Sequence, residues 1–139
     1  DGRKMSKSYN NSIYLSDEGE PLRQKIMTMM TDPARKRRDD KGNPDACPVY
    51  DLHKIFSSDE ELLWATEGCK SAEIGCVDCK KELSNGVNHF FCPIRDRRAE
   101  YAAKPKLVDE ILSDGARRAR IIANETIVEV REKMGLSVL

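Results

Sequence analysis

Two lysines and two serines near the start of the chain have the types and spacing to hold a polyphosphate. They form the run Lys4-Met5-Ser6-Lys7-Ser8, inside a polar segment of residues 1–16 that we call the lysine loop. A lysine ammonium is a compact point charge, and a movable segment can bring it onto pyrophosphate as negative charge develops there. These residues alone leave two interpretations open, a triphosphate-binding loop and a solvated polar terminus.

Four of the five cysteines have a spacing that favours a metal centre. Two residues separate Cys76 from Cys79, six separate Cys69 from Cys76, and twenty-one separate Cys47 from Cys69. Four thiolates suit tetrahedral zinc or an iron–sulfur cluster, and the asymmetric spacing favours the cluster. Cys92 competes with Cys47 as the fourth ligand. The other interpretation of Cys92 is a buried free thiol.

Any RNA-binding surface must be a local patch, because 24 Lys and Arg residues balance 24 Asp and Glu residues. The most compact basic run spans residues 35–38, and we select Arg35, Arg37 and Arg38 as candidates for phosphate contacts. Two aspartates follow this run directly. The alternative is therefore a solvated face whose charges pair with one another.

Apolar residues recur at helical spacing, so the sequence predicts an all-α fold with long loops. The expected helices cover residues 20–31, a short stretch around 52–56, a stretch from 58 that stops at Gly68, and residues 101–134 with a kink or break at Gly115. Loops are expected at 1–16 and 32–48, and short irregular structure at 69–92, where cysteines and glycines are frequent.

The 139 residues, 39% of them hydrophobic, suit one compact domain and are too few for a two-domain enzyme. The sequence contains no signal peptide and no apolar run long enough to cross a membrane, which predicts a cytoplasmic, reducing location. In that setting cysteines bind metal or stay free.

The run Lys4-Met5-Ser6-Lys7-Ser8 resembles the lysine-serine signature of class I aminoacyl-tRNA synthetases. In that family the loop lies against the ATP phosphates and drives adenylation of the amino acid. The resemblance implies that all five residues bind ATP, which carries Mg2+, and that Lys4 and Lys7 act catalytically by stabilising the departing pyrophosphate. It also implies that Ser6 adds hydrogen bonds and that the backbone of Met5 lies near the adenine.

The surrounding residues resemble bacterial tryptophanyl-tRNA synthetases over essentially the whole chain. The matching stretches are Tyr9-Asn10-Asn11, residues 31–35, Gly42-Asn43-Pro44 and residues 130–136. The resemblance implies that residues 1–16 belong to a catalytic domain and residues 17–139 to a helical anticodon-binding domain. Tryptophan, ATP and the tryptophan-specific tRNA are the implied partners. The implied full-length enzyme is a homodimer, whereas this region alone is expected to be inactive and can be monomeric.

The same resemblance assigns a role to the cysteines. Some bacterial members of the family hold a [4Fe-4S] cluster near the anticodon-binding region, on a similar arrangement whose first gap is slightly longer. This implies Cys47, Cys69, Cys76 and Cys79 as ligands, with zinc as the alternative metal. The alternative function for the whole chain is a stand-alone metal-binding module that recognises RNA, in which residues 1–16 are only a polar leader.

Overall fold

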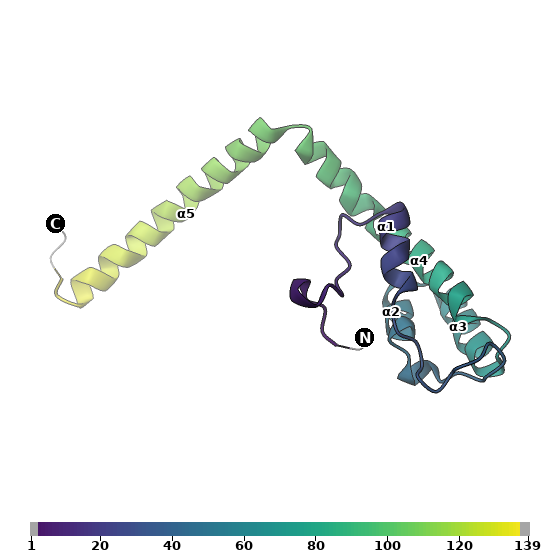
Figure 1. The fold of residues 1–139 in the computed structure, drawn as a ribbon. Helices are drawn as coiled ribbons and strands as arrows, with labels where there is room; N and C mark the ends of the chain where they lie inside the picture. Colours follow the sequence, from purple (N-terminus) through teal and green to yellow (C-terminus); the bar gives the residue numbers. More distant parts are fainter. Residues whose placement is uncertain (1–2, 137–139) are drawn as a thin grey trace. The chain divides into compact units, whose positions relative to one another are not determined.

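The computed structural model describes residues 3–136, and in that range all regular elements are helical (Figure 1). The all-α fold class is therefore confirmed. The elements are two 3-10 helices, η1 (Lys7–Tyr9) and η2 (Pro44–Ala46), and the α-helices α1 (Gly19–Met27), α2 (Pro48–Phe56), α3 (Asp59–Ser71), α4 (Cys76–Ala102) and α5 (Pro105–Lys133). No helix in the described range is long and apolar enough to span a membrane.

The start of α3 follows directly from its sequence. The Ser58 hydroxyl accepts the N–H of Glu61 at 3.3 Å, and the Glu61 carboxylate accepts the N–H of Ser58 at 2.8 Å. This reciprocal capping box satisfies two amide groups that would otherwise lack partners in the first turn. The predicted stop at Gly68 is wrong, because α3 continues to Ser71 and ends at Ala72, whose φ is +66°.

The largest difference from the sequence prediction is α4. Residues 69–92 were expected to be short and irregular, yet residues 76–102 form one helix. Gly86, one of the glycines on which that expectation rested, lies inside α4, where a Cβ would come within 2.7 Å of the Phe56 carbonyl oxygen. The glycine therefore allows close packing of α4 against the end of α2, instead of ending a helix.

The buried core lies where three helices meet. Its fully buried side chains are Leu22 and Ile26 from α1, Val49 from α2, and Leu83 and Val87 from α4. Their helical spacing places each pair on one face of its helix. Ile13 of the lysine loop and two cysteines, Cys47 and Cys79, pack against this core.

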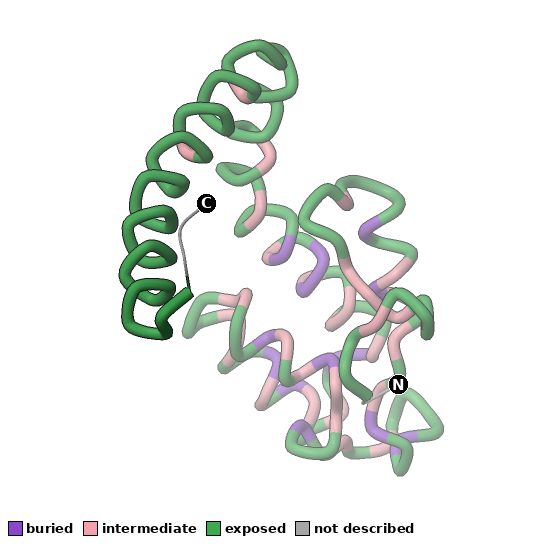
Figure 2. The backbone as a smooth tube through the Cα atoms, turned by 90° about the vertical axis from the view of Figure 1, so that its left-hand side faces the viewer, coloured by how far each residue is buried: buried purple, intermediate pink, exposed green. Residues whose placement is uncertain are grey.

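The chain divides into two compact units, residues 1–95 and 96–139. The first unit contains all the buried residues, which Figure 2 shows in purple. The second unit contains the end of α4 and the whole of α5, and α5 has no buried residue over its 29 positions. The break predicted at Gly115 is wrong, because α5 is continuous there.

Candidate functional site

The lysine loop contains a short turn that presents its charged residues to solvent. The Ser6 hydroxyl accepts the N–H of Ser8 at 3.3 Å and so caps η1, which begins at Lys7. Asn10 ends the turn in the left-handed region with a φ of +51°, a conformation that asparagine tolerates well. Lys4 and Lys7 are both exposed. Their ammonium groups are therefore available to an anionic ligand.

The side chain of Asn11 closes the loop on itself. Its Oδ1 accepts the backbone N–H of Ser6 at 2.7 Å, and its Nδ2 donates to the carbonyl oxygen of Lys4 at 3.4 Å. The two bonds bracket Met5. The loop thus has a defined shape made by bonds among its own residues.

The end of the loop is fixed to the helical body by charged groups. Asp17 accepts the ammonium of Lys25 at 2.6 Å and the N–H of Tyr14 at 2.7 Å, while Arg95 of α4 donates to the carbonyl oxygens of Leu15, at 3.3 Å, and of Asp17. Burial alone would raise the pKa of Asp17, but the bonds from Lys25 and Tyr14, with the nearby cations, lower it below its usual value. The carboxylate stays ionised and holds this junction.

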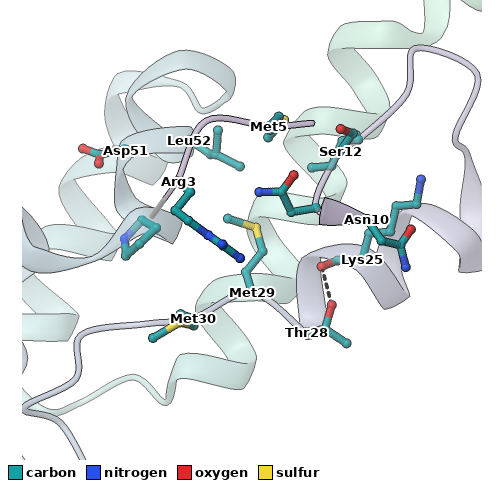
Figure 3. A pocket seen from close by; sticks show the side chains of 13 residues that line it. Arg3, Met5, Asn10, Ser12, Lys25, Thr28, Met29, Met30, Asp51 and Leu52 are labelled. Carbon is teal, nitrogen blue, oxygen red and sulfur yellow. Dashed lines mark hydrogen bonds between the residues drawn. The ribbon is translucent and has the colours of Figure 1, made fainter. Parts of the chain in front are cut away.

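A cavity of about 350 Å³ separates the middle of the loop from α1 and α2 (Figure 3). Met5 and Asn10 line it from the loop, Lys25 and Met29 from α1 and the turn after it, and Leu52 from α2. Ile13 also lines this cavity and packs against the buried core, so the loop is attached to the body from this residue onward.

Four cysteines from three different segments line one small cavity of about 20 Å³, which we call the cysteine cavity. Cys47 precedes α2, Cys69 lies in α3, and Cys76 and Cys79 occupy the first turn of α4. Cys92 is exposed and lies thirteen residues along α4 from Cys79, about 20 Å away, so it is not part of this group.

Burial raises the pKa of two of the four thiols. Burial raises the pKa of Cys79 to about 12, and the neighbouring Cys47, Cys69 and Cys76 add to the effect. Burial also raises the pKa of Cys69. Among the described residues, no three His, Cys, Asp or Glu side chains are placed to hold a single metal ion as they stand.

The wall of the cysteine cavity is built around Arg35. Its guanidinium donates from Nη2 to the carbonyl oxygens of Ile74 and Arg38, each at 2.7 Å, and Nη1 lies 3.9 Å from the sulfur of Cys69. Its Nε is buried without a hydrogen-bond partner among the described residues. The prediction that Arg35 contacts RNA does not agree with this position, because only 9% of the residue is exposed.

Gly42 and Asp32 complete the wall. The N–H of Gly42 donates to the carbonyl oxygen of Cys69 at 2.9 Å, and a Cβ at this glycine would lie 2.5 Å from the Cys69 sulfur. Asp32 accepts the N–H of Asn43 at 2.7 Å and of Ala34 at 2.9 Å, and these two bonds lower its pKa. The loop at 32–48 is therefore ordered by its own carboxylate and amide groups.

The family of class I tRNA synthetases for tryptophan and tyrosine, described as "tRNA synthetases class I (W and Y)", matches residues 1–92, which is more than half of the chain. The chain belongs to this family. The matched residues include both the lysine loop and the cysteine cavity.

The most similar relatives include two bacterial tryptophan–tRNA ligases. The chain is 44% identical to the one from Aquifex aeolicus and 47% identical to the one from Thermotoga maritima, in each case over 137 residues and 98% of this chain. These alignments cover 35% and 42% of the two relatives. The chain thus spans well under half the length of these relatives.

Two solved structures have a fold similar to that of this chain. A tryptophanyl-tRNA synthetase from Campylobacter jejuni, crystallised with ADP and tryptophan, superposes with a TM-score of 0.84 at 31% identity, covering 98% of this chain and 42% of that one. A second structure of the C. jejuni protein gives a TM-score of 0.83 at 30% identity, with 97% and 43% covered. The resemblance predicted from the lysine loop and its surroundings is confirmed at the level of the family.

The remaining candidate residues of the chain are divided between surface and core. Arg37 and Arg38 are exposed, as an RNA contact requires. His53 is fully buried and lies between Ser57, with Nδ1 2.7 Å from the hydroxyl oxygen, and Cys79, with Nε2 3.1 Å from the carbonyl oxygen. Burial lowers its pKa, so it is a neutral structural residue.

Sequence reasoning missed the residues that hold the site in place. Gly42 carried a signal only as part of a stretch that resembles the family, and Arg95 only as one of the 24 basic residues of the chain. Lys80 carried no stronger signal, although its ammonium donates to the carbonyl oxygens of Met27 at 3.0 Å and Met29 at 2.6 Å and so caps the end of α1. All three roles depend on contacts between residues far apart in the sequence.

Proposed function

We propose that this chain is the region of a tryptophan–tRNA ligase that supplies the pyrophosphate-stabilising loop and the helical domain that meets the tRNA anticodon. The full-length enzyme would activate tryptophan with ATP and transfer it to its tRNA. The observation that carries the proposal is the capped, solvent-facing turn with Lys4 and Lys7, within the part of the chain that matches the family. The C. jejuni relative holds ADP and tryptophan, which supports ATP and tryptophan as ligands.

In this proposal the two lysines act on the leaving group. Adenylation cleaves ATP between its α- and β-phosphates, and negative charge accumulates on the departing pyrophosphate. The ammonium groups of Lys4 and Lys7 would neutralise that charge as it forms, which lowers the barrier more than it strengthens ATP binding. Ser6 and Ser8 would add hydrogen bonds, and the backbone of Met5 would pass the adenine. Residues 1–16 thus serve catalysis and residues 17–139 serve RNA recognition.

The test is adenylate formation by the full-length enzyme with Lys4→Ala, Lys7→Ala and both together. Each single substitution should lower kcat of ATP–pyrophosphate exchange about a hundredfold, the usual loss for one transition-state donor. The matched control is Lys106→Ala, at an exposed position of α5. Unchanged exchange in the double variant would contradict the proposal.

We also propose that Cys47, Cys69, Cys76 and Cys79 hold a [4Fe-4S] cluster, with zinc as the alternative. Three observations support the fit: the four thiols share one cavity, the guanidinium of Arg35 lies beside them, and its buried Nε lacks a partner among the described residues. A cluster spreads its four ligands over four irons, and these four cysteines reach one cavity from three different segments. The bound group would fix three segments of the fold and so contribute folding free energy.

Anaerobic purification followed by iron, sulfide and zinc analysis tests this assignment. We expect about four irons and four sulfides per chain, lost in Cys76→Ser and in Cys47→Ser, and kept in the matched control Cys92→Ser. One equivalent of zinc without sulfide would overturn the cluster. Full iron in Cys47→Ser would overturn the ligand set.

Arg37 and Arg38 are our remaining candidates for contacts with the tRNA backbone. Both side chains are exposed. They lie next to the wall of the cysteine cavity, because the carbonyl oxygen of Arg38 accepts a hydrogen bond from the guanidinium of Arg35. Arg37→Ala should raise KM for tRNA several-fold and reduce the salt dependence of binding, without changing ATP–pyrophosphate exchange. If the salt dependence of tRNA binding does not change in this variant, Arg37 does not contact the tRNA backbone.

A further inference from the structure

The Asn11 side chain makes a two-point contact with the backbone of the lysine loop. Its Oδ1 faces the N–H of Ser6 at 2.7 Å, and its Nδ2 faces the carbonyl oxygen of Lys4 at 3.4 Å. The acceptor meets a donor and the donor meets an acceptor, so the amide fits this backbone in only one orientation. The short bond to Ser6 is the stronger of the two, since hydrogen bonds weaken beyond about 3.2 Å.

These bonds connect the two lysines through the backbone. One end of the bracket is the carbonyl of Lys4, and the other is the N–H of Ser6, whose own hydroxyl caps the turn that starts at Lys7. A single series of contacts therefore runs from Lys4 to Lys7. Fixing residues 4–6 relative to the turn fixes where both side chains leave the backbone.

The body of the protein does not provide this support. The cavity of about 350 Å³ lies between the loop and the helices α1 and α2, and Lys4, Met5 and Lys7 are exposed. The contacts that attach the segment to the body come after residue 11: Ile13 packs against the buried core, and Asp17 and Arg95 bind farther along. The positions of residues 4–7 relative to one another therefore depend on bonds within the loop.

We infer that Asn11 is a positioning residue for the adenylation step: it holds Lys4 and Lys7 in one shared presentation while the loop closes on the phosphates. This inference rests on the proposed function of the two lysines. Preorganised charges need no rearrangement at the moment of reaction, so the benefit falls on the transition state. Asn11 itself does not touch the reacting atoms.

The neighbouring Asn10 has a different task. It adopts the left-handed conformation that ends the turn, and its backbone N–H donates to the carbonyl oxygen of Lys7 at 3.1 Å. Glycine adopts the same conformation without strain. Asn10 is therefore used for its backbone and Asn11 for its side chain, although the two residues are adjacent and identical.

The experiment uses the full-length enzyme with Asn11→Leu and Asn11→Asp, assayed by ATP–pyrophosphate exchange. Asn11→Leu removes both bonds and should lower kcat about tenfold, while KM for ATP changes less than about twofold. Asn11→Asp keeps an acceptor for Ser6 but replaces the donor with a carboxylate oxygen that repels the carbonyl oxygen of Lys4, so kcat should fall at least about threefold. The control is Asn85→Leu, at an exposed position of α4, which should match the parent.

A double substitution separates positioning from general structure. If Asn11 acts through the lysines, Asn11→Leu should change kcat less than about twofold in a Lys7→Ala background, because the group that it positions is gone. An equal tenfold fall in both backgrounds would overturn the inference, as would Asn11→Leu with parental kcat. If Lys7→Ala is itself silent, the proposed function and this inference both fail. If Lys7→Ala is impaired and Asn11→Leu is not, only this inference fails.

Discussion

The lysine loop and the cysteine cavity are held together in opposite ways. The bonds that shape the loop join residues no more than seven apart, such as Asn11 and Lys4. The cavity is closed by contacts over much longer separations, such as Arg35 to the carbonyl of Ile74, 39 residues away. A substitution in the loop can therefore change activity without changing the stability of the protein. A substitution at the cavity changes both the site and the stability.

The largest effect that this comparison predicts is at Gly42. Alanine would place its Cβ 2.5 Å from the sulfur of Cys69 and 3.2 Å from Cδ of Arg35, so the wall of the cavity must move. Gly42→Ala should lower the free energy of unfolding by about 3 kcal/mol, measured by urea denaturation. It should also lower the bound iron. A variant with parental stability and parental iron would show that the two segments are not in tight contact.

A smaller loss is expected at Lys80, which joins α4 to the end of α1. Lys80→Met keeps most of the stem but removes two charge-assisted hydrogen bonds to the carbonyls of Met27 and Met29. The free energy of unfolding should fall by about 2 kcal/mol. The matched control is Lys81→Met, whose exposed ion pair with Asp78 at 3.4 Å should contribute less than about 0.5 kcal/mol. Equal losses of unfolding free energy in both variants would contradict the claim that Lys80 caps the end of α1.

Acid should weaken the cavity wall through Asp32. The N–H of Asn43 and then that of Ala34 lower the pKa of this carboxyl in the folded state below its ordinary value of 3.8. A lowered folded-state pKa means that the stabilisation is complete above the unfolded-state pKa and is lost as the pH falls through the folded-state value. Thermal unfolding between pH 5 and about pH 2 should show this loss, and Asp32→Asn should reduce its slope. An unchanged slope in Asp32→Asn would assign the acid sensitivity to other carboxylates.

The smallest predicted effect lies outside both sites, in α5. A Cβ at Gly115 would meet no atom within 4 Å, and the glycine lies in the middle of a helix. Gly115→Ala should stabilise α5 by about 0.5–1 kcal/mol, seen as slower amide hydrogen exchange in that helix. Exchange that becomes faster would indicate that the glycine is needed for a contact. Together with Gly42→Ala, this substitution gives opposite outcomes for the same chemical change.

The parts that the sequence predicts well depend on local signals. The capping box at Ser58 and Glu61, the all-α class and the exposed turn with Lys4 and Lys7 all follow from neighbouring residues. Such features need no knowledge of which distant segments meet. The cysteines are a different case: their spacing left Cys92 as an alternative to Cys47, and the family resemblance gave the set of four that lines one cavity.

The errors arose where tertiary packing determines the meaning of a residue. Glycine at position 86 and at position 115 indicated interruption, yet α4 and α5 are continuous through both. At Gly86 the reason is close approach to Phe56, which is 30 residues away. Arg35 was selected as a surface charge, and it is instead enclosed by Cys69 and Ile74. A basic run does not reveal which of its members turns inward.

The self-contained bonding of the lysine loop makes it portable. Ser6, Asn10 and Asn11 determine its shape from within a stretch of eight residues, 4–11. The conformation of this stretch therefore depends on its own residues. Transplanted between two members of the family, it should keep its conformation regardless of the host's helical body. Differences in catalytic rate that travel with such a graft would then belong to the loop, and differences that stay behind would belong to the host.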